Sequence, residues 1–192
     1  MKKIMTSTLI LVAITLIAGL SLAAVYEITK EPIAEAEHKA KMDAYRTVMP
    51  DATDFTETEL AATDLPAGVT VDEVMTAVTA DHATVGYVVK TTSANGYGGN
   101  ITVAVGILPN GKIQGVSVIS QSETAGLGAK CAEDGFTSQF AGLFGTVEYT
   151  KTGEEGKVDA LSGATITTSA VTEAVNAALS YVNQHIFTGE ES

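Results

Sequence analysis

The N-terminal part of the chain carries an unbroken apolar stretch. No charged residue occurs from Ile4 to Tyr26, two lysines precede this stretch, and Glu27 follows it. A helix rises about 1.5 Å per residue, so the stretch spans about 34 Å, enough to cross a hydrocarbon core of about 30 Å. The lysines before it and the carboxylates after it predict a transmembrane anchor in residues 1–26 with a cytoplasmic N-terminus.

A cleaved signal peptide is the alternative interpretation of the same stretch. Ser21-Leu22-Ala23 is an acceptable small-x-small cleavage site. The apolar run is longer than the roughly 7–15 residues usual in a signal peptide, which favours the anchor. Under either interpretation, residues 51–192 are expected to form an extracytoplasmic domain at the cell membrane.

Residues 27–50 are rich in Ala, Glu and Lys, and their apolar positions follow a helical period. They predict a juxtamembrane helix, with Pro32 in its first turn and Pro50 just beyond its end. Residues 51–68 are acidic and rich in Thr and Ala, and we expect short structure and loops there.

Strand patterns follow further along the chain. β-branched or alternating segments predict three strands, which the Asn110-Gly111 turn signal helps to join into an antiparallel meander. The segments are residues 83–90, 101–107 and 113–119. A short amphipathic helix is expected over 136–144, and a closing helix from Ala170, whose apolar residues share one face. The fold class is therefore α+β: an antiparallel sheet with helices packed on one side, preceded by one transmembrane helix.

Composition narrows the function. The 192 residues hold 11 Lys+Arg against 23 Asp+Glu, a net charge of −12, which argues against nucleic acid and against anionic membrane surfaces as partners. The single cysteine, Cys131, excludes a disulfide framework or a cysteine-rich metal cluster within the chain. The three histidines fit no zinc pattern, so we expect no metal site. We also expect no catalytic residue in this chain.

One segment, Asp159 to Ser169, is suited to binding chemistry. It holds a glycine and five hydroxyls directly before the closing helix. The unpaired N–H groups and positive dipole end of a helix stabilise a phosphate. A turn with a Ser/Thr N-cap explains the same residues, and from the residues alone both interpretations stay open.

The segment resembles the flavinylation motif Asp-x-x-(Ser/Thr)-Gly-Ala-Thr. That motif belongs to the FMN-binding domain found in the G subunit of Rnf electron-transport complexes and in the C subunit of the Na+-translocating NADH:quinone reductase. The matching residues are Asp159, Ser162, Gly163, Ala164 and Thr165. The strings Gly96–Gly99, Gly111–Val116 and Glu123–Gly128 follow in the order typical of the family, with Ala125 at a position where the family usually has proline.

The resemblance implies that FMN is joined through its phosphate to the hydroxyl of Thr165 as a phosphodiester, by a separate flavin transferase that takes FMN from FAD. Ser162, Gly163 and Ala164 would belong to the same site. Asp159 would be recognised by the transferase or would fix the turn. At least one of Thr167 and Thr168 is then expected to cap the helix.

The loop from Glu123 to Lys130 is expected to line the flavin ring. Leu127 would pack on a ring face, and the loop glycines would let backbone N–H groups approach closely. Lys130 would either stabilise a reduced anionic flavin or be a solvated surface lysine. The expected ring contacts are Glu123, Thr124, Gly126, Leu127, Gly128 and Lys130.

Together these features predict an electron-carrying subunit, without independent catalytic activity, of a membrane-bound Rnf-type ferredoxin:NAD+ oxidoreductase complex coupled to Na+ or H+ transport. Its partners would be integral membrane subunits and flavin or iron–sulfur subunits of that complex. The alternatives are a stand-alone extracytoplasmic flavin carrier, a quinone-reductase C subunit, or a non-redox scaffold domain tethered to the membrane.

Overall fold

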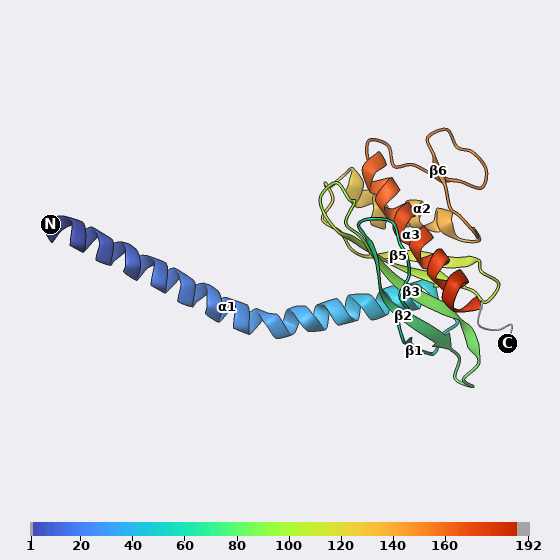
Figure 1. Cartoon of the computed structure of the whole chain (residues 1–192), viewed down its shortest axis with the longest axis horizontal. Coiled ribbons are helices and arrows are strands. Elements are labelled where there is room, and N and C mark those ends of the chain that lie inside the picture. The colour runs from blue at the N-terminus through green and yellow to red at the C-terminus, as the bar shows by residue number, and fades with distance from the viewer. Residues whose placement is uncertain (1, 188–192) are drawn as a thin grey trace. The chain divides into compact units, whose positions relative to one another are not determined.

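The structure, a computed structural model, describes residues 2–187 (Figure 1). The chain divides into two compact units, residues 1–40 and 41–192. The first unit is helical throughout its described residues, and it is formed by most of α1, Lys2–Val48. The second unit contains the last turns of α1 and all the strands.

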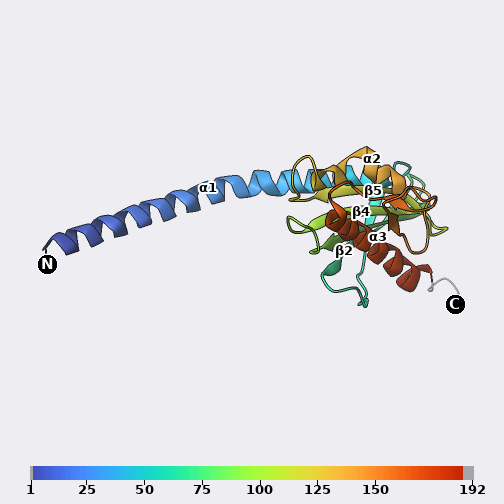
Figure 2. The same ribbon diagram turned by 90° about the horizontal axis from the view of Figure 1, so that it is seen from above.

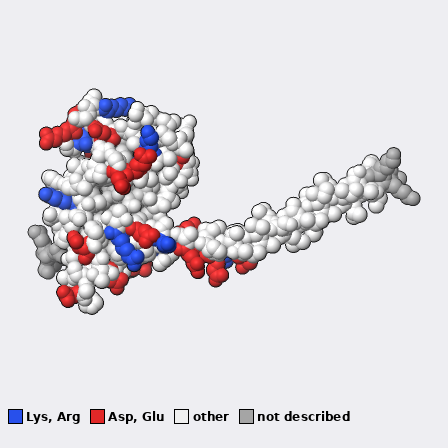
Figure 3. Space-filling view, turned by 180° about the vertical axis from the view of Figure 1, so that it is seen from behind, with Lys and Arg blue, Asp and Glu red and all other residues white. Residues whose placement is uncertain are grey.

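Helix α1 is continuous through Pro32, whereas the sequence analysis placed this proline in the first turn of a separate helix. A proline inside a helix removes one backbone hydrogen bond, and the Ala-, Glu- and Lys-rich turns on both sides are strong helix formers. The apolar side chains of residues 4–26 are exposed and are visible in Figure 3 as an uncharged stretch. Within residues 2–187, α1 is the one helix long and apolar enough to cross a membrane.

Five antiparallel strands form the main sheet, in the order in which they occur along the chain. They are β1 Asp54–Thr58, β2 Val69–Val78, β3 Thr84–Ser93, β4 Ile101–Ile107 and β5 Ile113–Ser120. The last three confirm the expected meander. β1 is an element of the short structure expected among the loops of residues 51–68, whereas β2 was not foreseen. In β2 the charged pair Asp72-Glu73 interrupts the apolar pattern, and the pairing with β3 shifts register between Val71 and Glu73.

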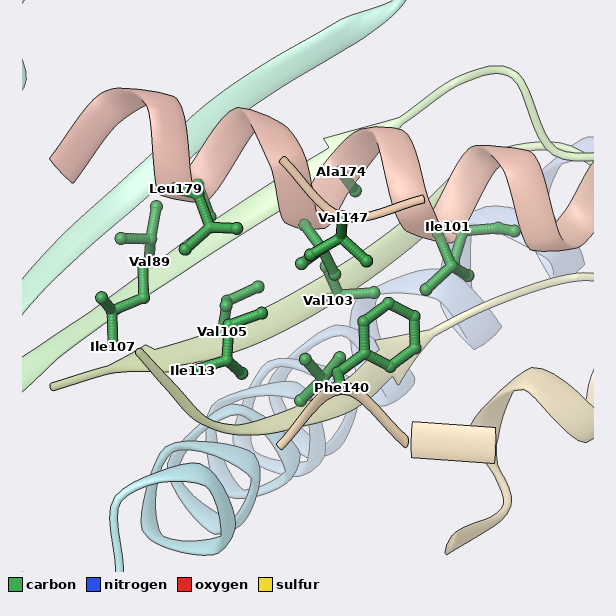
Figure 4. Close-up of a cluster of buried hydrophobic side chains, with 14 of the residues drawn as sticks. Val89, Ile101, Val103, Val105, Ile107, Ile113, Phe140, Val147, Ala174 and Leu179 are labelled. Carbon is green, nitrogen blue, oxygen red and sulfur yellow. The ribbon is translucent and has the colours of Figure 1, made fainter. Parts of the chain in front are cut away.

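One face of the sheet is covered by α3, Thr165–His185. Alternate residues of β4, such as Val103 and Val105, point toward this helix because side chains alternate across a strand. Figure 4 shows Ala174 and Leu179 of α3 directed at these valines, with Phe140 closing the cluster from another side. This cluster is the main hydrophobic core.

The opposite face of the sheet is covered by the end of α1, so the expectation of helices on one side only was wrong. Tyr45, Val48 and Met49 are fully buried there, in a second core cluster. The intervening residues of β4, Ala104 and Gly106, face this cluster. β4 is therefore buried on both faces, which explains its almost continuous apolar sequence.

Short elements complete the second unit (Figure 2). Three short helical elements follow the sheet: η1 Gly128–Ala132, α2 Asp134–Thr137 and η2 Ser138–Phe140. The amphipathic helix expected over residues 136–144 is therefore replaced by the end of α2 and by η2, which stops at Phe140. β6, Tyr149–Thr150, pairs in parallel with β7, Val158–Asp159. After these short elements, residues 160–164 lead into α3, whose first turn lies beside the loop that follows β5.

Candidate functional site

Antiparallel pairing brings two loops together at one end of the sheet. β3 ends at Ser93, β4 begins at Ile101 and β5 ends at Ser120, so the loops 94–100 and 121–128 emerge side by side. The start of α3 meets them, and the three segments enclose a cavity of about 530 Å3. The cavity is lined by Tyr97, Glu123, Thr124, Leu127, Gly128 and residues 163–167.

Thr165 is the first residue of α3, five positions before the start expected from the sequence. Ala164 occupies the N-cap position and forms no side-chain cap. The N–H of Thr168 donates the first helical hydrogen bond, to the Ala164 carbonyl at 3.0 Å. The N–H groups of residues 165–167 therefore have no acceptor within the helix. Because these residues line the cavity, the positive end of the helix dipole lies at the cavity wall.

The hydroxyls of this turn have different tasks. Thr168 Oγ1 donates to the Ala164 carbonyl at 3.0 Å and accepts from the N–H of Leu161 at 3.1 Å. Thr167 Oγ1 donates to Oε2 of Glu123. The prediction that Thr167 or Thr168 caps the helix was therefore wrong, because each hydroxyl is used elsewhere.

The hydroxyl of Thr165 is in a different position. Its side chain is half-buried and lines the cavity. Within residues 2–187 it has no hydrogen-bond partner. Ser169 is bound to Glu173 at 3.0 Å, and Ser162 is exposed outside the cavity lining. Of the five hydroxyl-bearing residues in the segment, Thr165 alone lines the cavity and has a hydroxyl without a hydrogen-bond partner among residues 2–187.

Glu123 ties the three segments together. Its side chain is only 8% exposed. Oε1 accepts a hydrogen bond from the N–H of Gly98 at 2.8 Å, and Oε2 accepts the bond from Thr167. A Cβ at Gly128 would lie 2.6 Å from both Glu123 Oε2 and Thr167 Oγ1, so any larger residue here would displace the hydrogen bond between them. The carboxylate therefore determines how closely the loops and α3 approach one another.

Three apolar side chains surround the cavity. Tyr97, Leu127 and Ile166 are 72%, 47% and 52% exposed, and they line one cavity together, as apolar residues at a ligand site do. Tyr97, Ile166 and Thr167 were not among the predicted site residues. The Gly96–Gly99 string did point toward Tyr97, since it matched the family's order, but no local pattern distinguishes Ile166 or Thr167 from core residues of a helix.

Most of the predicted site residues come together at the cavity. The predicted residues that line it are Glu123, Thr124, Leu127, Gly128, Gly163, Ala164 and Thr165. Four others lie outside the lining: Ser162, Gly126, Lys130 and Asp159. All four are at the surface, and the Asp159 N–H donates to Gln139 Oε1 at 2.7 Å.

The electrostatic character of the cavity is set by one charge. Glu123 is the charged residue among those that line it, and no Lys or Arg belongs to the lining. Cys131 is buried in the nearby core cluster, where burial first and the Glu123 charge second raise the pKa of its thiol to about 11. Among the described residues, an anion in this cavity can therefore bind only to backbone N–H groups and hydroxyls. An aromatic ring system can pack against the apolar side chains.

Comparisons with known proteins agree with this arrangement. Residues 96–180 match the FMN-binding domain family, and residues 1–48 match the RnfG N-terminal region. The chain is 34% identical, over 90% of its length and 87% of the relative, to the G subunit of the proton-translocating ferredoxin:NAD+ oxidoreductase complex of Clostridium ljungdahlii. It is 33% identical to the G subunit of the corresponding Na+-translocating complex of Acetobacterium woodii, over 91% of this chain and 89% of the relative.

A solved structure shows the same fold. The C subunit of the Na+-translocating NADH-quinone reductase of Parabacteroides distasonis superposes with a TM-score of 0.50 at 27% identity, covering 58% of this chain and 61% of that one. Because the match to the G-type sequences extends over nearly the whole length of both chains, the chain belongs to the family of G subunits of Rnf ion-translocating oxidoreductase complexes.

Proposed function

We propose that this chain is the electron-carrying G subunit of an Rnf-type ferredoxin:NAD+ oxidoreductase complex and carries FMN covalently bound to Thr165. The free, half-buried hydroxyl of Thr165 at the cavity wall is the observation that carries the proposal. The other hydroxyls of the turn that are buried are already hydrogen-bonded. A phosphate on Thr165 would lie beside the N–H groups that begin α3.

The charge of the cavity supports a covalent link. A dianionic phosphate held without a bond is usually matched by Lys or Arg, and neither lines this cavity. A phosphodiester carries one negative charge, which a helix N-terminus can match with its partial positive charge and its N–H groups. The link also prevents loss of the cofactor by dilution outside the cell.

Attachment is a group transfer that the chain cannot perform alone. The Thr165 oxygen forms a bond to the FMN phosphorus of FAD, the pyrophosphate bond breaks, and AMP leaves. The proton of the hydroxyl must pass to a base. Among the described residues that line the cavity there is no histidine or lysine, and the one carboxylate, Glu123, already accepts hydrogen bonds from Gly98 and Thr167. We therefore assign the base to a flavin transferase, for which the exposed Asp159 is a recognition point.

The residues around the cavity would hold and shield the cofactor. FMN supplies the electron-transfer chemistry when it is bound. Tyr97, Leu127 and Ile166 provide exposed apolar surface for a ring system, and Thr124 lies among them with its hydroxyl. Electrons would arrive from one redox subunit and leave to another, with the domain on the extracytoplasmic side and the N-terminus of α1 in the cytoplasm.

In-gel fluorescence tests the attachment directly. The full chain, produced with a flavin transferase, is expected to give a fluorescent band on a denaturing gel and a mass gain of one FMN less one water. Thr165→Ala should abolish both. Ser169→Ala, which removes a hydroxyl from the same turn, should keep both. A dark wild-type band at the mass of the bare polypeptide would favour a non-redox scaffold.

The orientation has its own test. Alkaline phosphatase fused to the C-terminus is active only after export, so the fusion is expected to be active in whole cells. Activity that arises only when the fused enzyme is placed before α1 would contradict the proposed topology.

A further inference from the structure

Glu123 is a buried acidic residue to which the proposed attachment at Thr165 assigns no role. It is 8% exposed, it lines the cavity, and it lies on a loop rather than on α3. Burying a carboxylate costs free energy unless hydrogen bonds compensate for the lost water. A chain that only needed to join two loops could use a neutral amide here, so the charge itself calls for an explanation.

The carboxylate is held in one place. An ionised carboxylate can only accept hydrogen bonds, and the two oxygens accept from Gly98 N–H and from Thr167 O–H. A Cβ at Gly96 would lie 2.8 Å from Oε1, and one at Gly128 would lie 2.6 Å from Oε2. The backbone therefore closes around the group from both sides and fixes the charge at the cavity wall.

We propose that Glu123 is a positioning residue whose fixed negative charge keeps the reduction potential of the bound flavin low. This inference rests on the proposed function. Lys130, which could counter the charge, is exposed and outside the cavity lining. The partial positive charge at the N-terminus of α3 also acts against the negative charge of Glu123. A phosphate bound at Thr165 would already be paired with that partial charge.

The expected size follows from Coulomb's law. Reduction of a flavin by two electrons with uptake of one proton leaves the ring one unit more negative; the electrons come from a redox partner or, in a titration, from dithionite. Glu123 and Thr165 line the same cavity, so we take a separation of about 10 Å between the carboxylate and a ring held there. At an effective dielectric constant of about 20, removing the charge should favour reduction about ten-fold or more. For a two-electron couple, ten-fold corresponds to about 30 mV.

Two pairs of equal-sized variants isolate the charge. Glu123→Gln is compared with the wild type, and Glu123→Asn with Glu123→Asp. A Gln side chain keeps an oxygen for the Gly98 N–H and offers an NH2 group to Thr167 Oγ1, so the loops stay joined. Each flavinylated full-length protein is titrated with dithionite in detergent while its absorbance is recorded.

Each amide variant is expected to have a more positive midpoint potential than its carboxylate counterpart, by about 30 mV or more. Thr167→Val, which removes a hydrogen bond but keeps the charge, should shift the potential much less than Glu123→Gln. Glu57→Gln, which removes an exposed carboxylate on β1, should not shift it.

Equal midpoint potentials within both pairs would overturn the inference. A shift for Thr167→Val as large as that for Glu123→Gln would also overturn it, because a purely structural role of Glu123 predicts equal shifts for these two variants. These outcomes leave the proposed function intact, since every titrated protein carries its flavin. A wild type that gains no covalent flavin would contradict the proposed function instead.

Discussion

The contact between Gly106 and Val48 provides a sharp test of how the end of α1 packs on the sheet. A Cβ added at Gly106 would lie 2.3 Å from the Val48 carbonyl oxygen and 2.9 Å from its carbonyl carbon. Both atoms belong to backbone, so no side-chain rotation can relieve the overlap. In Gly106→Ala the end of α1 must therefore move away by about 1 Å to restore ordinary contact.

That displacement would loosen a buried cluster. Tyr45, Val48 and Met49 are each no more than 1% exposed, and they move together because they belong to one helix end. Overpacking a core usually costs about 1–3 kcal/mol, and a backbone overlap belongs at the upper end of that range. Alanine recovers up to about 1 kcal/mol in a strand because glycine loses more conformational entropy on folding. The expected net loss is about 2 kcal/mol, the difference between these two effects.

Urea unfolding of the full chain in detergent, followed by tyrosine fluorescence, measures this loss. With a slope of about 2 kcal/mol per M, the midpoint should fall by about 1 M. Gly115→Ala is the matched control. Gly115 pairs with Gly106 across the strands, but its added Cβ would lie 3.3 Å from Val48 Cα, a contact that small shifts can accommodate. Equal midpoints for the two variants would refute the packing argument.

Three further predictions concern the core and the site. Phe140→Ala should lower the free energy of unfolding by about 3–5 kcal/mol, since this fully buried ring closes the main core; urea unfolding measures it, and a loss below about 1 kcal/mol would contradict the packing. Because burial raises the Cys131 pKa from 9.0 to about 11, the unfolded thiol ionises first; the wild type should lose stability between about pH 9 and 11, and Cys131→Ala should lose less. Asp159→Asn should reduce in-gel flavin fluorescence without changing the urea midpoint, because Asp159 is exposed; undiminished fluorescence would exclude a role in recognition.

The sequence revealed the parts of the sheet whose pattern is locally clear. β3, β4 and β5 are rich in β-branched residues and are separated by glycine turns, so short-range preferences agree with the final fold. β1 and β2 depend on pairing: β2 carries Asp72 and Glu73 in its middle, and it becomes a strand because β1 and β3 supply hydrogen bonds on both sides. The packing of the α1 end on the sheet also depends on long-range contacts. Val48 can approach the sheet closely because Gly106 of β4 and Gly115 of β5 have no side chains.

For the site, sequence and structure contribute different information. The motif indicated Thr165 as the attachment residue, and the structure adds that its hydroxyl is free while the hydroxyls of Thr167 and Thr168 are used. The sequence could not reveal the link between Glu123 and Thr167, because 44 positions separate them. Attachment itself stays a prediction for the fluorescence assay.

Among the described residues, no side chain caps the start of α3. A helix normally begins with Ser, Thr, Asp or Asn, and an alanine at the N-cap costs about 1 kcal/mol. Here Ala164 occupies that position, and the nearby Glu123 turns its oxygens to Gly98 and Thr167. The N–H groups of residues 165–167 are thus left unused by the described part of the protein, beside the free hydroxyl of Thr165. Local rules are most often broken at functional sites. An uncapped helix start is a weakness if the cavity binds nothing, but it is the arrangement that a phosphate on Thr165 would complete.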